Sequence, residues 1–475
     1  MRQFRFVRTQ RLIEMADKKR YVLVGTGSRS EIYIQALVKD YCEVSELVAL
    51  CDISAGRMQV YAEWAAHYGV QVRTYLAGEF DRMLSECRPC TVIVTSKDST
   101  HDQYIVRAME MGCDVITEKP MTMHEDKCQR ILETCQNTGR QCRVAFNYRY
   151  SPANTQIKDL LMSGVIGEVR SVDFHWLLNT THGADYFRRW HRHKANSGGL
   201  QVHKSTHHFD LVNWWLSSVP TRIYAVGALN FYTPRTADRY GLNKRADRCL
   251  ECPEAARCPF YFDARAYPNI VKLYLNNEAC DGYHRDSCVF AATIDIEDTL
   301  HVIAEYRNHV QMSYSLHAFM PWEGYTVAFN GSCGRLEHTC RETVYVSGDG
   351  QIPGELLGDG TRTRIIPNFQ PGYDVPIWQG EGGHGGGDSR LLDDLFNPNR
   401  QHDKYMRTAD QRAGAYSILT GIGASRSMEW GRPVHIDELV RGLNEPDYPA
   451  MPSSDELIDP HAFRPDQTTE FFVEG

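Results

Sequence analysis

The chain has 475 residues and a formal net charge of −8. That length allows two or three domains and a sizeable core. The mild acidity, without a basic stripe, argues against a nucleic-acid partner. No run of about 18 apolar residues predicts a membrane span, and the basic segment 2–20 lacks the apolar centre of a secretory signal. Fifteen cysteines, mostly single and in apolar segments, favour reduced thiols and a cytoplasmic location.

The first predicted elements are a strand, a glycine turn and a helix. The apolar run 21–24 precedes the loop Gly25-Thr26-Gly27-Ser28-Arg29, and helical spacing follows over 31–41. A dinucleotide-binding loop requires this order. The first glycine permits a tight turn, the second lets the backbone approach a pyrophosphate, and the start of the helix offers N–H groups to that anion. Ser30 replaces the third glycine, so the loop alone is weak evidence.

A second predicted strand, 46–51, ends at Asp52. An acid at this point accepts hydrogen bonds from the adenosine ribose and repels a 2′-phosphate, so NAD is expected rather than NADP. Two alternatives stay open. Asp52 precedes a predicted helix and could cap it, and Arg57 could accommodate the phosphate of NADP.

Further strands and helices alternate up to about residue 146. Helical patterns cover 58–68 and 101–111, and strand patterns cover 91–95 and 113–117. This alternation predicts an N-terminal doubly wound parallel sheet of the Rossmann type, over residues 1–146. The cofactor contacts expected beyond the glycine loop are Thr95, Ser96, His101, Glu118 and Lys119.

Glu118-Lys119-Pro120 follows the last of these strands. The carboxyl ends of parallel strands face the crevice where doubly wound folds bind ligands. A lysine there can hydrogen-bond a substrate hydroxyl and lower its pKa, and the proline fixes the backbone that carries it. The alternative is a surface lysine before a helix.

The sequence resembles the family of glucose–fructose oxidoreductases, inositol dehydrogenases and MocA-like oxidoreductases (Gfo/Idh/MocA). The residues that carry the resemblance are Gly25-Thr26-Gly27, Asp52, Ser99-Thr100-His101, Glu118-Lys119-Pro120, Asn147-Tyr148-Arg149-Tyr150, the segment 164–169, Ser197-Gly198-Gly199, His207, Asp210 and the helix 413–425. The resemblance implies a second α/β domain, 147–445, with a large, mostly antiparallel open sheet. It also implies NAD or NADP as cofactor, a sugar or polyol substrate, and a homodimer or homotetramer formed through the sheet. Residues 446–475 are expected to form an extended tail.

Histidines precede a predicted buried helix that begins at Phe209. On a helix, His203 and His207 are four residues apart and share a face. A neutral imidazole suits the removal of a hydroxyl proton, and the resemblance places His207 at the family's catalytic histidine. His203 stands where many members have an aspartate, so the substrate's hydroxyl pattern is left open. A metal site that adds His191 or His193 and a packing role are the alternatives.

Four other positions complete the predicted substrate site. Asn147 and Arg149 belong to the motif quoted above. Tyr186 and His191 lie in a segment of aromatic and basic residues, 186–192, which is expected to be a loop whose rings and guanidinium groups suit a polyol. His384 lies in the glycine-rich segment 381–388, where the glycines allow close approach to a ligand. Each segment could also be an ordinary connection.

An insertion at about 235–290 contains closely spaced cysteines. The spacing C-x2-C-x5-C followed by a further cysteine favours a structural zinc site, or an iron–sulfur cluster, held by Cys249, Cys252, Cys258 and Cys288. Cys280 could replace any of them. Four reduced thiols without a metal are the alternative.

These features predict an NAD(P)-dependent enzyme that transfers hydride between a sugar or polyol hydroxyl and the nicotinamide, with Lys119 and His207 as its catalytic residues. Two alternatives remain. The first is a glycoside-cleaving enzyme that oxidises its substrate transiently before elimination. The second is an NAD-binding regulator without catalysis.

Overall fold

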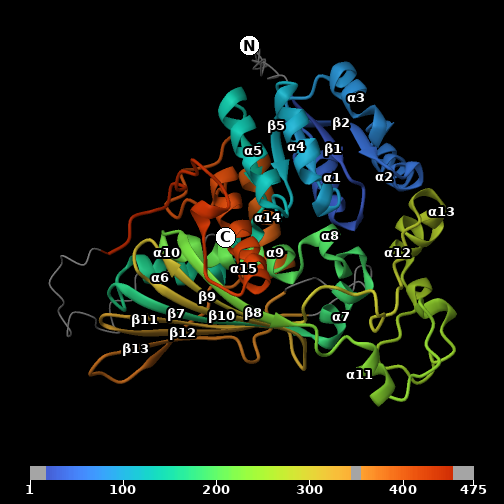
Figure 1. The fold of residues 1–475 in the computed structure, drawn as a ribbon. Helices are drawn as coiled ribbons and strands as arrows, with labels where there is room; N and C mark the ends of the chain where they lie inside the picture. The colour runs from blue at the N-terminus through green and yellow to red at the C-terminus, as the bar shows by residue number, and fades with distance from the viewer. Residues whose placement is uncertain (1–17, 344–354, 453–475) are drawn as a thin grey trace, which may run out of the picture.

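The computed structural model describes residues 18–343 and 355–452. They form two sheets, one built from strands between residues 19 and 144 and the other from strands between 169 and 435 (Figure 1). No helix in these two ranges is both long and apolar enough to cross a membrane.

The N-terminal half contains a six-stranded sheet in the order β3-β2-β1-β4-β5-β6. All its strand pairs are parallel, as the alternating strands and helices predict. Its strands are β1 (Lys19–Val24), β2 (Ser45–Asp52), β3 (Arg73–Leu76), β4 (Thr91–Val94), β5 (Asp114–Thr117) and β6 (Cys142–Val144). Its helices are α1 (Glu31–Gln35), continued by a π-helix over Ala36–Asp40, α2 (Ala55–His67), α3 (Phe80–Cys87), α4 (His101–Glu110) and α5 (Glu125–Thr138).

The C-terminal half contains a nine-stranded sheet in the order β14-β13-β12-β11-β7-β10-β9-β8-β15. Among the described strands of this second sheet only β7 and β10 pair in parallel, so the predicted mostly antiparallel sheet is confirmed. The strands are β7 (Val169–Asn179), β8 (Pro220–Ala228), β9 (Thr299–Tyr306), β10 (Gln311–Met320), β11 (Gly324–Gly331), β12 (Gly334–Arg341), β13 (Arg362–Pro367), β14 (Tyr373–Val375) and β15 (Val434–His435).

One face of the larger sheet carries the core and the other is open. Buried and less buried residues alternate along β9 and β12, as expected for a sheet covered on one side. Helices α6 (Pro152–Met162), α10 (Ser205–Leu216) and α15 (Gln411–Trp430) lie on the covered face (Figure 1). On the uncovered face, β8 and β9 expose Tyr224, Val226 and Ile303.

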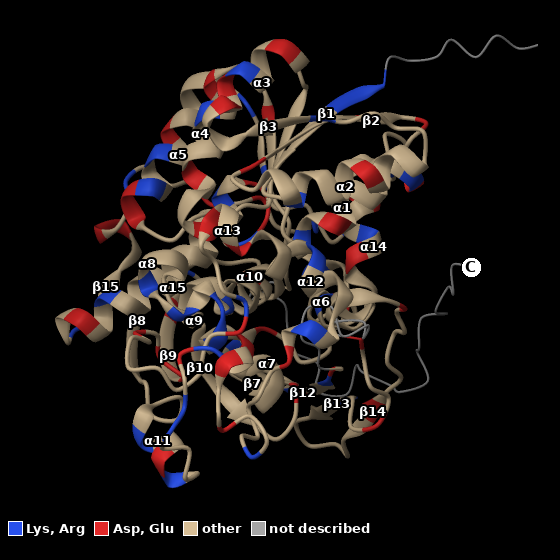
Figure 2. Cartoon of the chain, turned by 90° about the vertical axis from the view of Figure 1, so that its right-hand side faces the viewer, with Lys and Arg blue, Asp and Glu red and all other residues tan. Residues whose placement is uncertain are grey.

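The remaining helices connect the two halves or belong to the insertion. They are α7 (Thr180–Arg188), α8 (Lys194–Ser197), α9 (Leu200–His203), α11 (Pro234–Arg239), α12 (Pro268–Leu273), α13 (Glu278–Asp281) and α14 (Gly383–Phe396). Figure 2 shows basic and acidic residues interspersed along α3, α4 and α5.

One of the two segments expected to be loops is helical. Residues 186–192 form the end of α7 and a 3₁₀ turn. The glycine-rich segment leads into α14 through left-handed, non-helical backbone at His384, Gly385 and Gly386, as a loop does. The glycines let this turn pack on the protein itself: a Cβ on Gly387 would lie 2.3 Å from the carbonyl oxygen of Asn147.

Candidate functional site

The glycine loop has the geometry of a dinucleotide cradle. Gly25 has φ +94°, and a Cβ there would lie 2.4 Å from the backbone nitrogen of Ser96. Only glycine fits such a turn. The Thr26 hydroxyl is buried without a hydrogen-bond partner, and a buried polar atom of this kind normally has one. The loop therefore fits a phosphate-bearing cofactor.

Asp52 lies at the end of β2, beside this loop. Its carboxylate accepts hydrogen bonds from the backbone of Thr26 at 2.6 Å and Ser54 at 2.8 Å. It also accepts one from the Arg57 guanidinium at 2.9 Å. The cap of α2 is Ser54, whose side chain accepts from the backbone of Arg57, so the capping alternative for Asp52 is wrong.

Ser28 and Arg29 of the loop both have partners in the protein. The backbone N–H of Ser28 donates to the Tyr274 hydroxyl at 3.0 Å. The Arg29 guanidinium lies 2.6 Å from the Glu118 carboxylate and 3.3 Å from that of Asp388. Arg29 thus links the loop to Glu118 and to α14.

The expected contacts at the end of β4 are tied to the backbone. The Thr95 hydroxyl donates to the carbonyl of Gly25 at 2.6 Å, and the Ser96 hydroxyl lies 2.9 Å from that of Thr100. The nitrogens of the buried His101 ring lie 2.8 Å from the carbonyl of Pro120 and 3.0 Å from that of Ser96. Burial lowers the pKa of His101, and a neutral ring has one N–H to donate to one of these carbonyls. His101 thus links the end of β4 to the segment after Lys119, and its predicted cofactor contact stays a prediction.

Glu118-Lys119-Pro120 follows β5, with a cis bond between Lys119 and Pro120. The Glu118 carboxylate accepts from Arg29 at 2.6 Å, from the Tyr33 hydroxyl at 2.8 Å and from the backbone of Lys119 at 3.2 Å. Glu118 therefore holds the backbone of Lys119 in place, and its predicted cofactor contact stays a prediction.

The Lys119 ammonium donates to the carbonyl of His203 at 3.4 Å. Burial lowers the pKa of Lys119 to about 8, although the charges of Asp98 and Glu118 oppose this shift. Lys119 is thus a charged donor that loses its proton at mildly alkaline pH.

The carbonyl of His203 is available because the predicted helix is interrupted. Helix α9 ends at His203 and α10 begins at Ser205. The backbone N–H of His207 donates to the carbonyl of Lys204 at 3.3 Å, whereas a continuous α-helix would direct it to His203. The break gives Lys119 its acceptor.

His207 lies in the first turn of α10, beside the rings of Tyr148 and His384. Its ring is 4.8 Å from that of Tyr148 and 6.4 Å from that of His384, measured between centroids. Burial and the charge of Lys119 hold the pKa of His207 well below its usual range. Its Nδ1 is buried without a partner. The imidazole is therefore neutral and able to accept a proton.

His203 belongs to a second group of side chains, near Asp98. Its Nδ1 shares a short hydrogen bond with the Asp98 carboxylate. Its ring is 4.2 Å from that of His191 and 5.6 Å from that of Tyr186. The structure thus brings together three of the predicted substrate residues, His203, His191 and Tyr186.

Asn147 and His384 meet at Asp388. The Asp388 carboxylate accepts from the Asn147 amide at 2.7 Å and lies 2.9 Å from Nδ1 of His384. The Asn147 amide oxygen is buried without a partner.

Arg149 is paired within the protein. Its guanidinium makes two hydrogen bonds, of 2.7 and 2.6 Å, to the equally buried carboxylate of Asp210. Its remaining nitrogen, Nη1, donates to the carbonyl of Arg407 at 3.5 Å. These buried contacts contradict the predicted substrate contact and give Arg149 a structural role, in which it joins α10 to the segment before α6.

Three residues of the site were not predicted from the sequence. Asp98 lies in the segment after β4, and that position was the only signal for it. Lys204 lies 4.6 Å from the ring of Trp176, between two predicted histidines. Glu342 accepts from the Tyr148 hydroxyl at 3.1 Å, and burial raises its pKa to about 7. No sequence pattern points to Glu342.

The four predicted metal ligands line one small cavity of about 20 Å³. They are Cys249, Cys252, Cys258 and Cys288, and each is a free cysteine. Within residues 18–343 and 355–452, however, no three or more His, Cys, Asp or Glu side chains are grouped so that they could hold a metal ion. The same finding applies to His191, His193, His203 and His207. The thiols are gathered, but not in the arrangement of a metal site.

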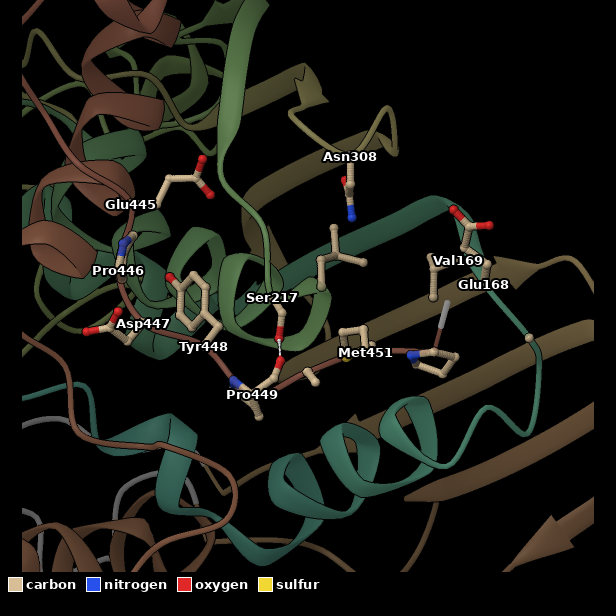
Figure 3. Close-up of a pocket in the computed structure, with 14 residues that line it drawn as sticks. Glu168, Val169, Ser217, Asn308, Glu445, Pro446, Asp447, Tyr448, Pro449 and Met451 are labelled. Carbon is tan, nitrogen blue, oxygen red and sulfur yellow. Dashed lines mark hydrogen bonds between the residues drawn. The ribbon is translucent and has the colours of Figure 1, made fainter. Parts of the chain in front are cut away.

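A larger cavity, of about 530 Å³, lies away from this chemistry (Figure 3). It lies between the segment 445–452, the end of α10 and the start of β7. None of the predicted site residues lines it. This cavity is therefore separate from the residues around Lys119 and His207.

Sequence comparisons agree with this architecture. Residues 19–146 match a family model described as an oxidoreductase family NAD-binding Rossmann fold, and 158–436 match one described as the C-terminal α/β domain of that family. The chain is 36% identical over 438 residues to YteT of Bacillus subtilis, named only as an oxidoreductase; the match covers 90% of this chain and all of YteT.

Two further relatives have more specific names. An inositol 2-dehydrogenase of Salmonella typhimurium is 29% identical over 147 residues, which cover 31% of this chain and 42% of the relative. The crystal structure of an aldose-aldose oxidoreductase from Caulobacter crescentus has a TM-score of 0.58 at 16% identity, covering 88% of this chain and 99% of the other. The structural likeness establishes the fold.

Proposed function

The chain belongs to the Gfo/Idh/MocA family of oxidoreductases, and on that premise we propose that it is an NAD-dependent dehydrogenase of a sugar or polyol. The coarser part, a nicotinamide-binding oxidoreductase, follows from the family. The substrate class rests on the relatives named for inositol and aldose chemistry. The preference for NAD rests on Asp52, because a carboxylate beside the ribose repels a 2′-phosphate.

The observation that carries the proposal is the proximity of a charged Lys119, after β5, to a neutral His207 in the first turn of α10. The Lys119 ammonium donates to the carbonyl of His203, four residues before His207, and its charge contributes to the lowered pKa of His207. A bound nicotinamide supplies the acceptor for a hydride. Lys119 donates a hydrogen bond to the substrate hydroxyl oxygen, which makes its proton more acidic, and the imidazole of His207 accepts that proton.

The other residues of the crevice have positioning or binding roles in this proposal. Glu118 and His101 hold the lysine through the contacts described above. His203, His191 and Tyr186 bind the remaining hydroxyls, and aromatic rings provide apolar surface for the C–H face of the ring. Neither alternative, glycoside cleavage nor a non-catalytic regulator, is favoured by a specific contact among the described residues.

The test is NAD reduction across a panel of sugars, inositols and glycosides, with product analysis for released aglycone. We expect at least one sugar or polyol to reduce NAD. For that substrate, His207→Asn and Lys119→Met should each lower kcat by at least about 10², while NADH binding persists. Near-normal turnover in both variants would refute the assignment, and glycoside hydrolysis without net NADH formation would favour the first alternative.

A further inference from the structure

Part of the cysteine-containing insertion lies on the N-terminal domain. Helices α12 and α13 lie beside α2 (Figure 1). Ile270, Leu273 and Tyr274 belong to the same buried apolar cluster as Met58 and Tyr61 of α2. The insertion therefore packs against the dinucleotide-binding half of the chain, although it belongs in sequence to the other half.

Tyr274 reaches the glycine loop itself. Its hydroxyl lies 3.0 Å from the backbone nitrogen of Ser28 and 2.9 Å from the Ser28 hydroxyl. A Cβ on Gly27 would lie 3.4 Å from the same phenol oxygen. In dinucleotide-binding loops, backbone N–H groups of this turn bind the pyrophosphate. The phenol oxygen therefore lies where a phosphate oxygen would accept a hydrogen bond.

A second set of contacts ties the insertion to the ribose-binding acid. The Arg57 guanidinium lies 2.9 Å from the Asp52 carboxylate and 2.7 Å from that of Asp281. All three side chains are less than a tenth exposed. A buried, charge-assisted arrangement of this kind is stronger than a surface ion pair. The Ser54 hydroxyl adds a bond of 3.2 Å to the Asn277 amide oxygen.

We infer that residues 268–281 form a clasp over the adenosine and pyrophosphate end of the cofactor site, and that opening of this clasp sets the rate of cofactor exchange. The inference rests on the proposed use of a nicotinamide cofactor. Tyr274 must leave the Ser28 N–H before a phosphate can accept from it. After the cofactor has bound, the ion pair between Arg57 and Asp281 closes the clasp again, so a bound cofactor leaves slowly.

The first experiment measures NADH uptake by the full chain, and NADH release with excess NAD as the competitor, by stopped-flow fluorescence. Tyr274→Phe should accelerate uptake by up to about tenfold, because it removes a hydrogen bond that only the cofactor-free loop makes. Asp281→Asn should accelerate release by more, because it removes the charged partner that holds the clasp closed. Tyr283→Phe is the matched control, because Tyr283 lies in the same insertion but its hydroxyl has no hydrogen-bond partner. Uptake and release in the control should each stay within about twofold of the native rate.

A second experiment closes the clasp covalently. A Cβ on Gly56 would lie 3.0 Å from the Asn277 Cγ, a distance compatible with a disulfide after small adjustment. The oxidised double variant Gly56→Cys, Asn277→Cys should take up NADH at least about a hundredfold more slowly, and dithiothreitol should restore uptake. Each single variant, treated in the same way, controls for the native thiols.

These measurements separate the two proposals. If the native chain binds neither NADH nor NADPH, both the proposed function and the clasp are wrong. If it binds NADH but uptake is unchanged in Tyr274→Phe and release is unchanged in Asp281→Asn, or uptake is unchanged in the oxidised double variant, the clasp alone is wrong. Faster uptake in Tyr274→Phe and faster release in Asp281→Asn, with an unchanged control, support it.

Discussion

The Asp98 carboxylate shares a hydrogen bond with Nδ1 of His203, and its charge is the strongest influence raising the pKa of Lys119. One buried acid therefore acts on two of the proposed site residues. It orients the ring of His203 and helps to keep a proton on Lys119. Burial raises the pKa of Asp98 itself, and Lys119 opposes that shift.

The protonation of Lys119 should be visible in the pH dependence of turnover. Burial lowers its pKa to about 8, so the ammonium is present below pH 8 and lost as the pH rises through that value. We expect kcat/KM to fall over this range, because the neutral amine polarises a substrate hydroxyl less well. Lys119→Arg keeps its charge at every accessible pH, so the falling limb should vanish, at lower overall activity. A profile that retains the limb near pH 8 in this variant would contradict the assignment.

Removal of the Asp98 charge should shift the pH at which kcat/KM falls. Asp98→Asn keeps a side chain of the same size but no longer favours the ammonium of Lys119, so its pKa should fall further. We expect the decline of kcat/KM to begin at lower pH than in the native enzyme. Measured with the same substrate, Asp81→Asn is the control, since Asp81 pairs with Arg107 at the surface. An unshifted profile in Asp98→Asn would show that the two groups are not coupled.

The Arg149–Asp210 pair should contribute to stability rather than to substrate affinity. Asp210→Asn leaves a buried guanidinium without its counter-charge, which typically costs about 3–5 kcal/mol in the free energy of unfolding. Urea denaturation of the full chain measures this change. Glu305→Gln removes a partner of the exposed Arg222 and should cost no more than about 1 kcal/mol. Equal losses in the two variants would contradict the structural role.

The open face of the nine-stranded sheet should carry an association between copies of the chain. Tyr224 and Ile303 are register partners on β8 and β9, and Val226 lies on the same face because it is two residues from Tyr224. Val226 and Ile303 are each about half exposed, which is unusual for apolar side chains so close together. Light scattering should show an oligomer that Val226→Glu with Ile303→Glu converts to a monomer. Val44→Glu, on the other domain, should leave the oligomer intact, and a monomeric native chain would refute the association.

The sequence allowed four of the six strands and three of the five α-helices of the Rossmann domain to be predicted. The strands that were predicted are continuous apolar runs, so local pattern and tertiary role coincide there. Strands β3 and β6 were missed because they are short and carry polar residues. The mostly antiparallel sheet was predicted from the family resemblance, and the structure confirms it.

The other predictions that were wrong or absent have a common physical cause, which is that the side chains concerned pair with residues distant in the sequence. Asp210, the partner of Arg149, is 61 residues away, so nothing in the sequence indicated that Arg149 is paired, and it was predicted to bind the substrate. Residues 186–192 looked like a loop because their aromatic and basic side chains lack a helical period. The structure pairs Asp185 of that helix with Arg285 of the insertion. Glu342 and Asp98 gained their environments only when distant strands came together.

The cysteine insertion shows what spacing alone can predict. The pattern C-x2-C-x5-C correctly indicated that these thiols converge, since they line one cavity. Whether they bind a metal depends on the distances between the sulfur atoms, and spacing does not fix those distances. The role of the same insertion over the glycine loop had no local signature, because Tyr274 lies 246 residues from Ser28.

The attachment of α12 to α2 also bears on truncation. Met58 and Tyr61 are buried in part by Ile270 and Leu273, and Tyr21 of β1 meets Phe396 of α14 edge to face at 5.3 Å. A fragment that ends near residue 146 would lack both contacts, and these apolar side chains would be exposed to water. Expressed alone, it should therefore be prone to aggregation and only marginally stable. Only the intact polypeptide should give a stably folded nucleotide-binding domain.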